Sequence, residues 1–205
     1  MSEERIYQYP VWIRIWHMLN ALLCLILILT GLSMQFSDPK YPVIRFDIAV
    51  SIHNIAGILL LCNYIFFFTG NLATVNGRQY KLGRGIWGRL AKQFHYYLTG
   101  IFKHESAPFP ITEEQKFNPL QQFTYLITMY ILVPVVFISG IALMYPDFIP
   151  TTIFTKSGLH TTDLLHILAG FCISMFMFIH IYFCTVGKSP VSNFKSIING
   201  YHEPH

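Results

Sequence analysis

The sequence has few charged residues. Asp, Glu, Lys and Arg make up only 12% of its 205 residues, whereas 53% are hydrophobic and the mean hydropathy is +0.45. This balance excludes an ordinary soluble domain and is typical of a protein that crosses the membrane several times. The net charge of +4 is read by position, because a membrane protein gathers its basic residues in particular loops. We therefore expect contacts with membrane lipid and no nucleic-acid partner.

Cysteine is also scarce. The four cysteines lie in or beside apolar segments and form no Cys-x-x-Cys or Cys-x-x-Cys-His pattern. Their spacing argues against an iron–sulfur cluster, a disulfide framework and covalent attachment of a c-type haem, so we interpret them as reduced packing residues. Acidic residues are nearly absent from the centres of the apolar segments. Their scarcity there argues against a proton or metal transporter with histidine relay sites.

Four long apolar segments are present instead. They cover approximately residues 12–36, 47–69, 120–145 and 161–186. Each is near or above the roughly 20 residues that a helix needs to cross a bilayer. Between the second and third segments, residues 84–104 show apolar side chains at helical spacing among Lys and Arg, which predicts an amphipathic interfacial helix. We predict an all-α membrane protein in which residues 1–205 form a single domain, a four-helix up-and-down bundle.

The basic residues are distributed unevenly between the loops. With four spans, eleven of the fourteen Lys and Arg residues share the side of both termini and of the connection between the second and third spans. Cytoplasmic loops of membrane proteins are enriched in Lys and Arg. We therefore expect a multi-pass protein of the bacterial inner membrane. Both termini and the amphipathic helix would be cytoplasmic.

Four histidines lie within or beside the apolar segments. His166 and His180 are fourteen residues apart, about 40° short of four helical turns, so they share one helix face and are roughly 21 Å apart. The topology places His17 and His180 near the cytoplasmic surface, and His53 and His166 near the periplasmic surface. A buried imidazole is costly in a membrane, so four of them at paired depths indicate a shared ligand role.

Haem fits these pairs better than zinc. Zinc takes three or four protein ligands, whereas two opposed imidazoles match the two axial positions of haem iron. We predict two haem b groups, one held by His17 and His180 and the other by His53 and His166. A six-coordinate haem has no open position, which indicates electron transfer.

Several other residues are candidate haem contacts. Gly57 and Gly170 each lie one turn after a ligand histidine, where a larger side chain would strike the porphyrin, and Gly31 and Gly140 could serve likewise. The alternative for each glycine is close packing of helices. Arg14, one turn before the first ligand, is a candidate partner for a haem propionate, with anchoring at the cytoplasmic surface as the alternative.

Four motifs are distinctive when they are taken together. They are Pro10-Val-Trp-Ile-Arg-Ile-Trp-His17, Ser51-Ile-His53-Asn-Ile-Ala-Gly57, Lys116-Phe-Asn118-Pro-Leu-Gln121 and Leu165-His166-Ile-Leu-Ala-Gly170. In this combination the chain resembles the prokaryotic di-haem cytochrome b family, over essentially its whole length. That family includes the membrane subunits of formate dehydrogenase, nickel-iron hydrogenase and thiosulfate reductase.

The resemblance implies a quinone site beside the cytoplasmic haem, for menaquinone or ubiquinone. The family positions that border the quinone are Asn118, Gln121 and His180 in this sequence. An amide side chain at the membrane surface can donate a hydrogen bond to a quinone carbonyl. Asn118 also fits a helix N-cap ahead of Pro119, and the two roles are compatible.

These expectations describe an electron-transfer subunit of a quinone-linked oxidoreductase complex. Its partner would be a periplasmic iron–sulfur or cytochrome c subunit that docks on residues 38–46 and 146–160. The alternative is a stand-alone transmembrane reductase, which would use the same haems to move cytosolic electrons to an external acceptor such as ferric ion.

Overall fold

The computed structural model describes residues 6–38, 40, 42–110, 112, 115–187 and 189–202. Two of the basic residues counted above, Arg5 and Lys188, lie outside the described residues. So do two residues of the predicted docking segment 38–46. The chain divides into two compact units. Unit 1 comprises Met1–Arg14, Gly70–Tyr130 and Ile179–His205, and unit 2 comprises Ile15–Thr69 and Ile131–Phe178.

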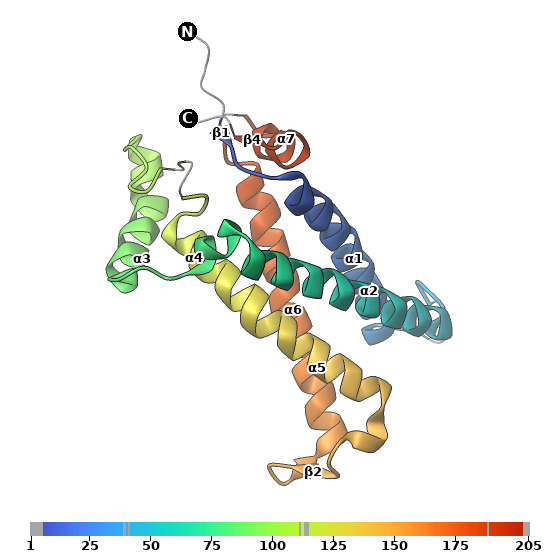
Figure 1. Ribbon diagram of the computed structural model, residues 1–205. Helices are drawn as coiled ribbons and strands as arrows, with labels where there is room; N and C mark the ends of the chain where they lie inside the picture. Colours follow the sequence, from blue (N-terminus) through green and yellow to red (C-terminus); the bar gives the residue numbers. More distant parts are fainter. Residues whose placement is uncertain are drawn as a thin grey trace. The chain divides into compact units, whose positions relative to one another are not determined.

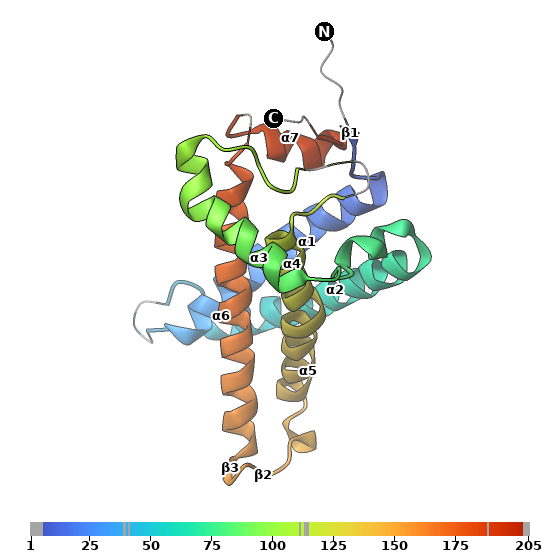
Figure 2. The same ribbon diagram turned by 90° about the vertical axis from the view of Figure 1, so that its left-hand side faces the viewer.

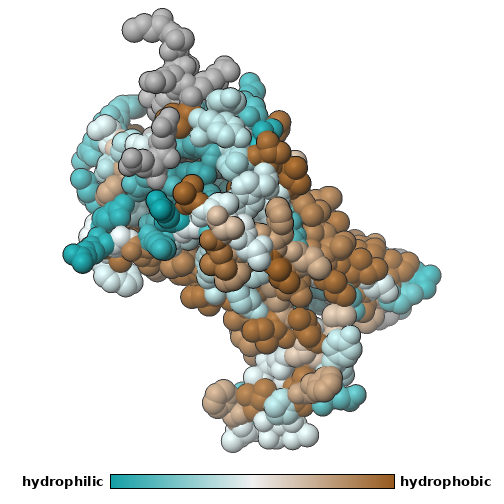
Figure 3. All heavy atoms as spheres, viewed as in Figure 1, coloured by the Kyte–Doolittle hydropathy of each residue, from teal (hydrophilic) through white to brown (hydrophobic). Residues whose placement is uncertain are grey.

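Within the described residues, four helices are long and apolar enough to cross a membrane. They are α1 (Val11–Gln35), α2 (Phe46–Ala73), the helix Pro119–Met144 and α6 (Gly158–Cys184), labelled in Figure 1. At most 28% of the most apolar stretch of any of them is buried inside the protein. Apolar side chains accordingly cover the helix surfaces that face the viewer in Figure 3, as expected for helices surrounded by lipid. The predicted all-α class with four spans is confirmed.

The third span is not a uniform α-helix. It consists of α4 (Pro119–Ile127), the π-helical turn η4 (Thr128–Leu132) and α5 (Val133–Met144). Pro134 has no N–H to donate to the carbonyl four residues earlier. The irregular turn therefore falls where the α-helical hydrogen-bond ladder is already incomplete.

Unit 1 contains the amphipathic segment. It begins with α3 (Ile86–His95) and continues through the π turn η2 (Tyr96–Gly100) and the short 3-10 helix η3 (Ile101–Lys103). Helix α3 packs against α4, and the Trp87 and Phe123 rings meet edge to face with centroids 6.1 Å apart. The structure thus has a helix in the segment where the sequence pattern predicts an interfacial one.

The chain ends of unit 1 also pair with each other. Helix α7 (Ser192–Asn199) ends at Gly200, whose φ of +92° is a left-handed conformation that glycine adopts without strain. This turn directs β4 (Tyr201–His202) to pair antiparallel with β1 (Ile6–Tyr7). A 3-10 helix, η1 (Val75–Tyr80), follows α2 in the same unit.

Unit 2 holds a buried apolar cluster. Leu23 of α1, Ala56 and Leu60 of α2 and Phe137 of α5 form one buried cluster. After α5, a short 3-10 helix, η5 (Pro146–Phe148), leads into a hairpin of β2 (Thr152–Ile153) and β3 (Lys156–Ser157). Figure 2 shows α5 and the first part of α6 side by side, with this hairpin at their joined ends.

The start of α4 is fixed by a reciprocal pair of hydrogen bonds. Asn118 Oδ1 accepts a bond of 2.9 Å from the backbone N–H of Gln121, and Gln121 Oε1 accepts one of 3.1 Å from the backbone N–H of Asn118. This is a capping box, and Pro119 occupies the first helical position, where no donor is needed. The predicted N-cap role of Asn118 is confirmed.

Replacing this cap lowers stability. Asn118→Ala removes the side-chain acceptor and is expected to lower the free energy of unfolding by about 1 kcal/mol. Asn118→Asp keeps an acceptor oxygen and retains most of that stability. Thermal or denaturant unfolding in detergent measures both. Thr124→Ala in the same helix is the control, because its hydroxyl bonds only carbonyls of its own helix. Equal stability of Asn118→Ala and the wild type would contradict the capping role.

Candidate functional site

Two of the predicted ligands face each other in unit 2. The ring centroids of His53 on α2 and His166 on α6 are 6.2 Å apart, and the ring planes cross at 68°. Metal–imidazole bonds are about 2.0–2.1 Å long. Two rings that share one metal ion therefore have centres roughly 6 Å apart, once about 1 Å is added for each ring radius. The observed separation matches one metal ion between the two rings.

A buried hydroxyl holds each of these rings. Thr30 Oγ1 of α1 lies 2.9 Å from His53 Nδ1, and Ser139 Oγ of α5 lies 3.0 Å from His166 Nδ1. Both hydroxyl-bearing residues are only 2% exposed. All four residues belong to unit 2. They come from α1, α2, α6 and α5, the last of which is the final part of the third span.

The glycines near the ligands fall into two kinds. A Cβ built on Gly57 or Gly170 would meet nothing within 4 Å, so each faces open space, as the predicted role beside a porphyrin requires. A Cβ on Gly31 would lie 3.6 Å from Cε1 of His53, and one on Gly140 would lie 3.0 Å from Cε1 of His166. A side chain at Gly31 or Gly140 would thus meet the imidazole itself, and their expected role beside a porphyrin stays a prediction.

The other two predicted ligands lie in different units. His180 belongs to unit 1, where its Nδ1 is 3.0 Å from the hydroxyl of Tyr125 on α4 and its Nε2 is 3.7 Å from Sγ of Cys184. His17 belongs to unit 2, where its ring is 6.4 Å from that of its neighbour Trp16. The pairing of His17 with His180 stays a prediction.

The predicted quinone residues are joined to the His180 region within unit 1. Asn118 Nδ2 donates a bond of 2.8 Å to the hydroxyl of Tyr97, and the Tyr97 ring lies 5.1 Å from that of Phe183 on α6. The rings of Phe117 and Tyr125 are 4.8 Å apart. Burial raises the pKa of Tyr97, so its phenol keeps its proton at neutral pH.

Arg14 is held at the surface of unit 1. Its guanidinium donates to the backbone carbonyl of Ile198 in α7. Its Nε atom is buried and has no hydrogen-bond partner among the described residues. A buried donor of this kind suits an anionic group such as a haem propionate.

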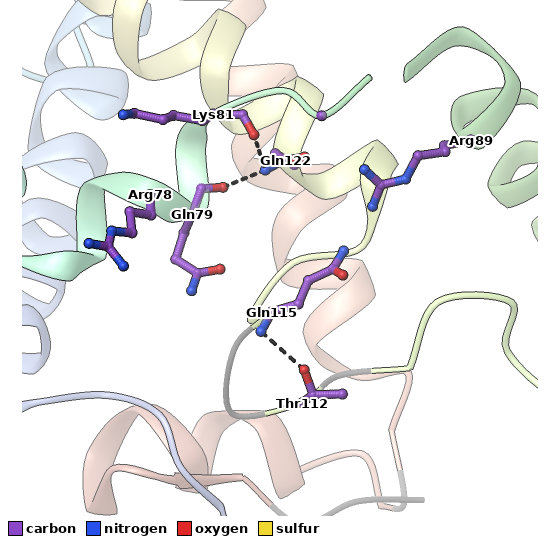
Figure 4. Close-up of a pocket in the computed structure, with 8 residues that line it drawn as sticks. Arg78, Gln79, Lys81, Arg89, Thr112, Gln115 and Gln122 are labelled. Atoms are coloured by element: carbon purple, nitrogen blue, oxygen red, sulfur yellow. Dashed lines mark hydrogen bonds between the residues drawn. The ribbon is translucent and has the colours of Figure 1, made fainter. Parts of the chain in front are cut away.

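A polar cavity of about 300 Å³ also lies in unit 1. Its lining residues are Arg78, Gln79, Lys81, Gly83, Arg89, Thr112, Gln115 and Gln122. Figure 4 shows Gln122 donating to the backbone carbonyls of Gln79 and Lys81, at 2.8 and 2.9 Å. Beside this region, Lys116 Nζ donates to Asn76 Oδ1 at 3.1 Å, and burial lowers the pKa of this lysine. These bonds tie η1 to the start of the third span, and none of the lining residues is a predicted haem or quinone ligand.

Facing imidazoles on membrane-spanning helices, with open space at the adjacent glycines, fit the axial ligands of a membrane haem protein. This combination defines the class as a membrane haem b protein that transfers electrons. The family model for prokaryotic cytochrome b561 matches residues 8–200, and the chain belongs to this family, whose members bind haem b. The resemblance stated from the motifs is confirmed.

One curated relative shows the same relationship. The Escherichia coli (strain K12) protein named "Putative cytochrome YdhU" is 37% identical over 201 residues, which cover 97% of this chain and 75% of that protein. No solved structure matches the chain. In this chain, His53 and His166 would hold a haem, which when bound supplies a site for reversible one-electron reduction.

Sequence reasoning missed Thr30 and Ser139. Each directly precedes a glycine, Gly31 or Gly140, that lies against the same imidazole. The two ligands also begin the same short pattern, His-x-x-Ala-Gly. A search for a hydroxyl–glycine pair in the span preceding each His-x-x-Ala-Gly would have found both residues.

Removing either imidazole tests the site. His53→Ala and His166→Ala each delete one axial ligand, so we expect each to lower the haem b absorbance per protein in the purified, reduced sample. His160→Ala is a matched control, because His160 lies on α6 only six residues before His166 and is exposed. Haem content equal to that of the control in both variants would show that the pair does not bind haem.

Proposed function

We propose that this protein carries electrons between a periplasmic redox partner and the membrane quinone pool, through two haem b groups. The observation that carries the proposal is the His53–His166 pair, with ring centroids 6.2 Å apart within the membrane-spanning part of unit 2. A haem with two histidine ligands transfers electrons and binds no further substrate at its iron. The protein then needs an electron donor and an acceptor at opposite membrane surfaces.

The second haem lies at the other membrane surface in this proposal. His180 is fourteen residues after His166 on the same helix, and this spacing corresponds to roughly 21 Å along the axis. Its partner is His17, and the buried Nε of Arg14, three residues earlier, is the donor for a propionate. The bond between His180 Nδ1 and Tyr125 supports a ligand role, because metal-binding histidines commonly bond a second group through the other ring nitrogen.

The quinone would bind beside His180, near the start of α4. The capping box uses Asn118 Oδ1 and Gln121 Oε1, and Tyr97 receives a bond from Asn118 Nδ2. The NH2 group of Gln121 is the donor that this network leaves for a quinone carbonyl. A quinone that is reduced at this surface takes up its protons there.

A conservative substitution tests the quinone contact. Gln121→Glu keeps the Oε1 acceptor of the capping box but replaces the NH2 donor. We expect haem reduction by a menaquinol or ubiquinol analogue to slow about tenfold, which corresponds to about 1.4 kcal/mol, the value of one hydrogen bond. Stopped-flow absorbance of the haem bands measures the rate.

Gln35→Glu is the control, because it makes the same change in an exposed amide at the end of α1, in unit 2, whereas the start of α4 belongs to unit 1. Haem content and unfolding should be unchanged in both variants. An undiminished rate in Gln121→Glu would contradict the assigned contact. Failure of quinol to reduce the wild-type haems, with reduction by a cytosolic donor, would favour the stand-alone reductase.

The partner would dock on the hairpin between α5 and α6. Phe154 is 93% exposed at its tip, and Phe148, in the preceding turn, is 84% exposed. The two tip residues, Phe154 and Thr155, have φ angles of +46° and +67°. Two-residue turns of this kind favour Asn-Gly, and a bulky or β-branched residue there is strained. Such strain persists where a residue has a role that a turn-forming residue cannot fill.

Replacing the turn residues tests whether Phe154 binds the partner or is needed for folding. The double variant Phe154→Asn/Thr155→Gly supplies the preferred turn residues while it removes the exposed aromatic ring. We expect haem content to stay at the wild-type level, whereas recovery of the iron–sulfur or cytochrome c partner with the purified protein falls. Recovery equal to that of the wild type would exclude Phe154 from the interface.

A further inference from the structure

The hydroxyls of Thr30 and Ser139 occupy equivalent positions around the two facing imidazoles. We propose that these two side chains are positioning residues that fix the tautomer of His53 and His166 and thereby lower the reduction potential of the haem between them. The inference rests on the proposed haem at this pair. It assigns Thr30 and Ser139 a task beyond helix packing.

The single hydrogen of each hydroxyl is already used. Thr30 Oγ1 donates to the carbonyl of Ile26 at 2.7 Å, and Ser139 Oγ donates to the carbonyl of Val135 at 2.7 Å. A hydroxyl has one donor and two acceptor lone pairs. With that hydrogen donated to the carbonyl, each oxygen accepts from the imidazole nitrogen beside it. The hydrogen of that second bond must be on Nδ1 of the histidine.

The direction of these bonds decides which nitrogen is free for a metal. A neutral imidazole with its hydrogen on Nδ1 has its lone pair on Nε2. The opposite tautomer would require each hydroxyl to turn its hydrogen from the carbonyl to Nδ1, and so to give up its 2.7 Å bond to that carbonyl. Both His53 and His166 are thus set to bind through Nε2 before a metal arrives.

The same arrangement of hydroxyl, glycine and alanine surrounds both imidazoles. On α1 and on α5, the hydroxyl residue is followed by a glycine at which a Cβ would lie within 4 Å of Cε1 of the same ring. On α2 and on α6, the ligand is followed by a buried alanine, Ala56 or Ala169, and then by a glycine that borders open space. The small residues allow the helices to approach, and the hydroxyl then reaches the ring.

The expected effect on the haem has a definite sign. A hydrogen bond from Nδ1–H to an oxygen makes the imidazole a more basic ligand. A more basic ligand stabilises ferric iron more than ferrous iron, so the bonds from His53 and His166 lower the reduction potential. Removing an acceptor should raise the potential and weaken haem binding by about tenfold or more.

Thr30→Val and Ser139→Ala test the inference in the intact protein. Thr30→Val keeps the side-chain shape, and Ser139→Ala removes a single oxygen, so at least one variant should retain the fold. The readout is the midpoint potential of each haem, from redox titration monitored by absorbance. We expect the midpoint potential of one haem to rise in each variant and to rise further in the double variant.

Rescue and control variants separate positioning from packing. Thr30→Ser keeps the hydroxyl and should retain the wild-type potential. Thr69→Val and Ser174→Ala are matched controls, because these hydroxyls bond only carbonyls of their own helices. If both Thr30→Val and Ser139→Ala lose stability without any change in midpoint potential, the hydroxyls contribute only to helix packing and the inference is overturned.

The ligand variants distinguish a failure of the proposed haem site from a failure of the proposed role of the two hydroxyls. If His53→Ala and His166→Ala retain all haem, the proposed haem site is wrong and the inference fails with it. If the ligand variants lose haem while Thr30→Val and Ser139→Ala match their controls in potential, the inference alone is wrong.

Discussion

The site depends on the hydrogen bond between a buried hydroxyl and the Nδ1 atom of a membrane imidazole. A histidine in an apolar span carries two polar nitrogens, and each needs a partner. Thr30 and Ser139 lie 2.9 and 3.0 Å from Nδ1, so Nε2 of each ring is the nitrogen that we propose for the metal. In the proposed haem site, haem binding and helix packing would therefore rely on the same contacts.

The helices around this bond are suited to lipid on one side and to a cofactor on the other. Among the described residues, Leu23, Ala56, Leu60 and Phe137 form a buried cluster, while at most 28% of the most apolar stretch of any span is buried. The imidazole pair lies among small residues, such as Gly57 and Gly170, that leave open space beside it. A porphyrin would supply apolar surface that the side chains of these spans do not.

Much of the fold and part of the site could be predicted from the residue pattern. Apolar length identified four spans, and the spacing of Lys and Arg among apolar residues identified the amphipathic segment near α3. The cap at Asn118 followed from its position before Pro119. The π turn at Thr128–Leu132 was missed, because the sequence around it remains apolar and its hydrogen bonds leave no periodic signal.

The sequence by itself determined the class of protein, because apolar length and paired histidine depths depend on local periodicity and on the cost of burying an imidazole in lipid. Only the tertiary structure decided that His53 and His166 face each other and which residues touch them. Thr30 and Ser139 reach these rings from other helices, and the glycine after each is a position where a side chain would meet the same ring. Contacts of this kind join residues 23 and 27 positions apart. Helix packing sets their distances, and the residue pattern within one helix carries no information about that packing.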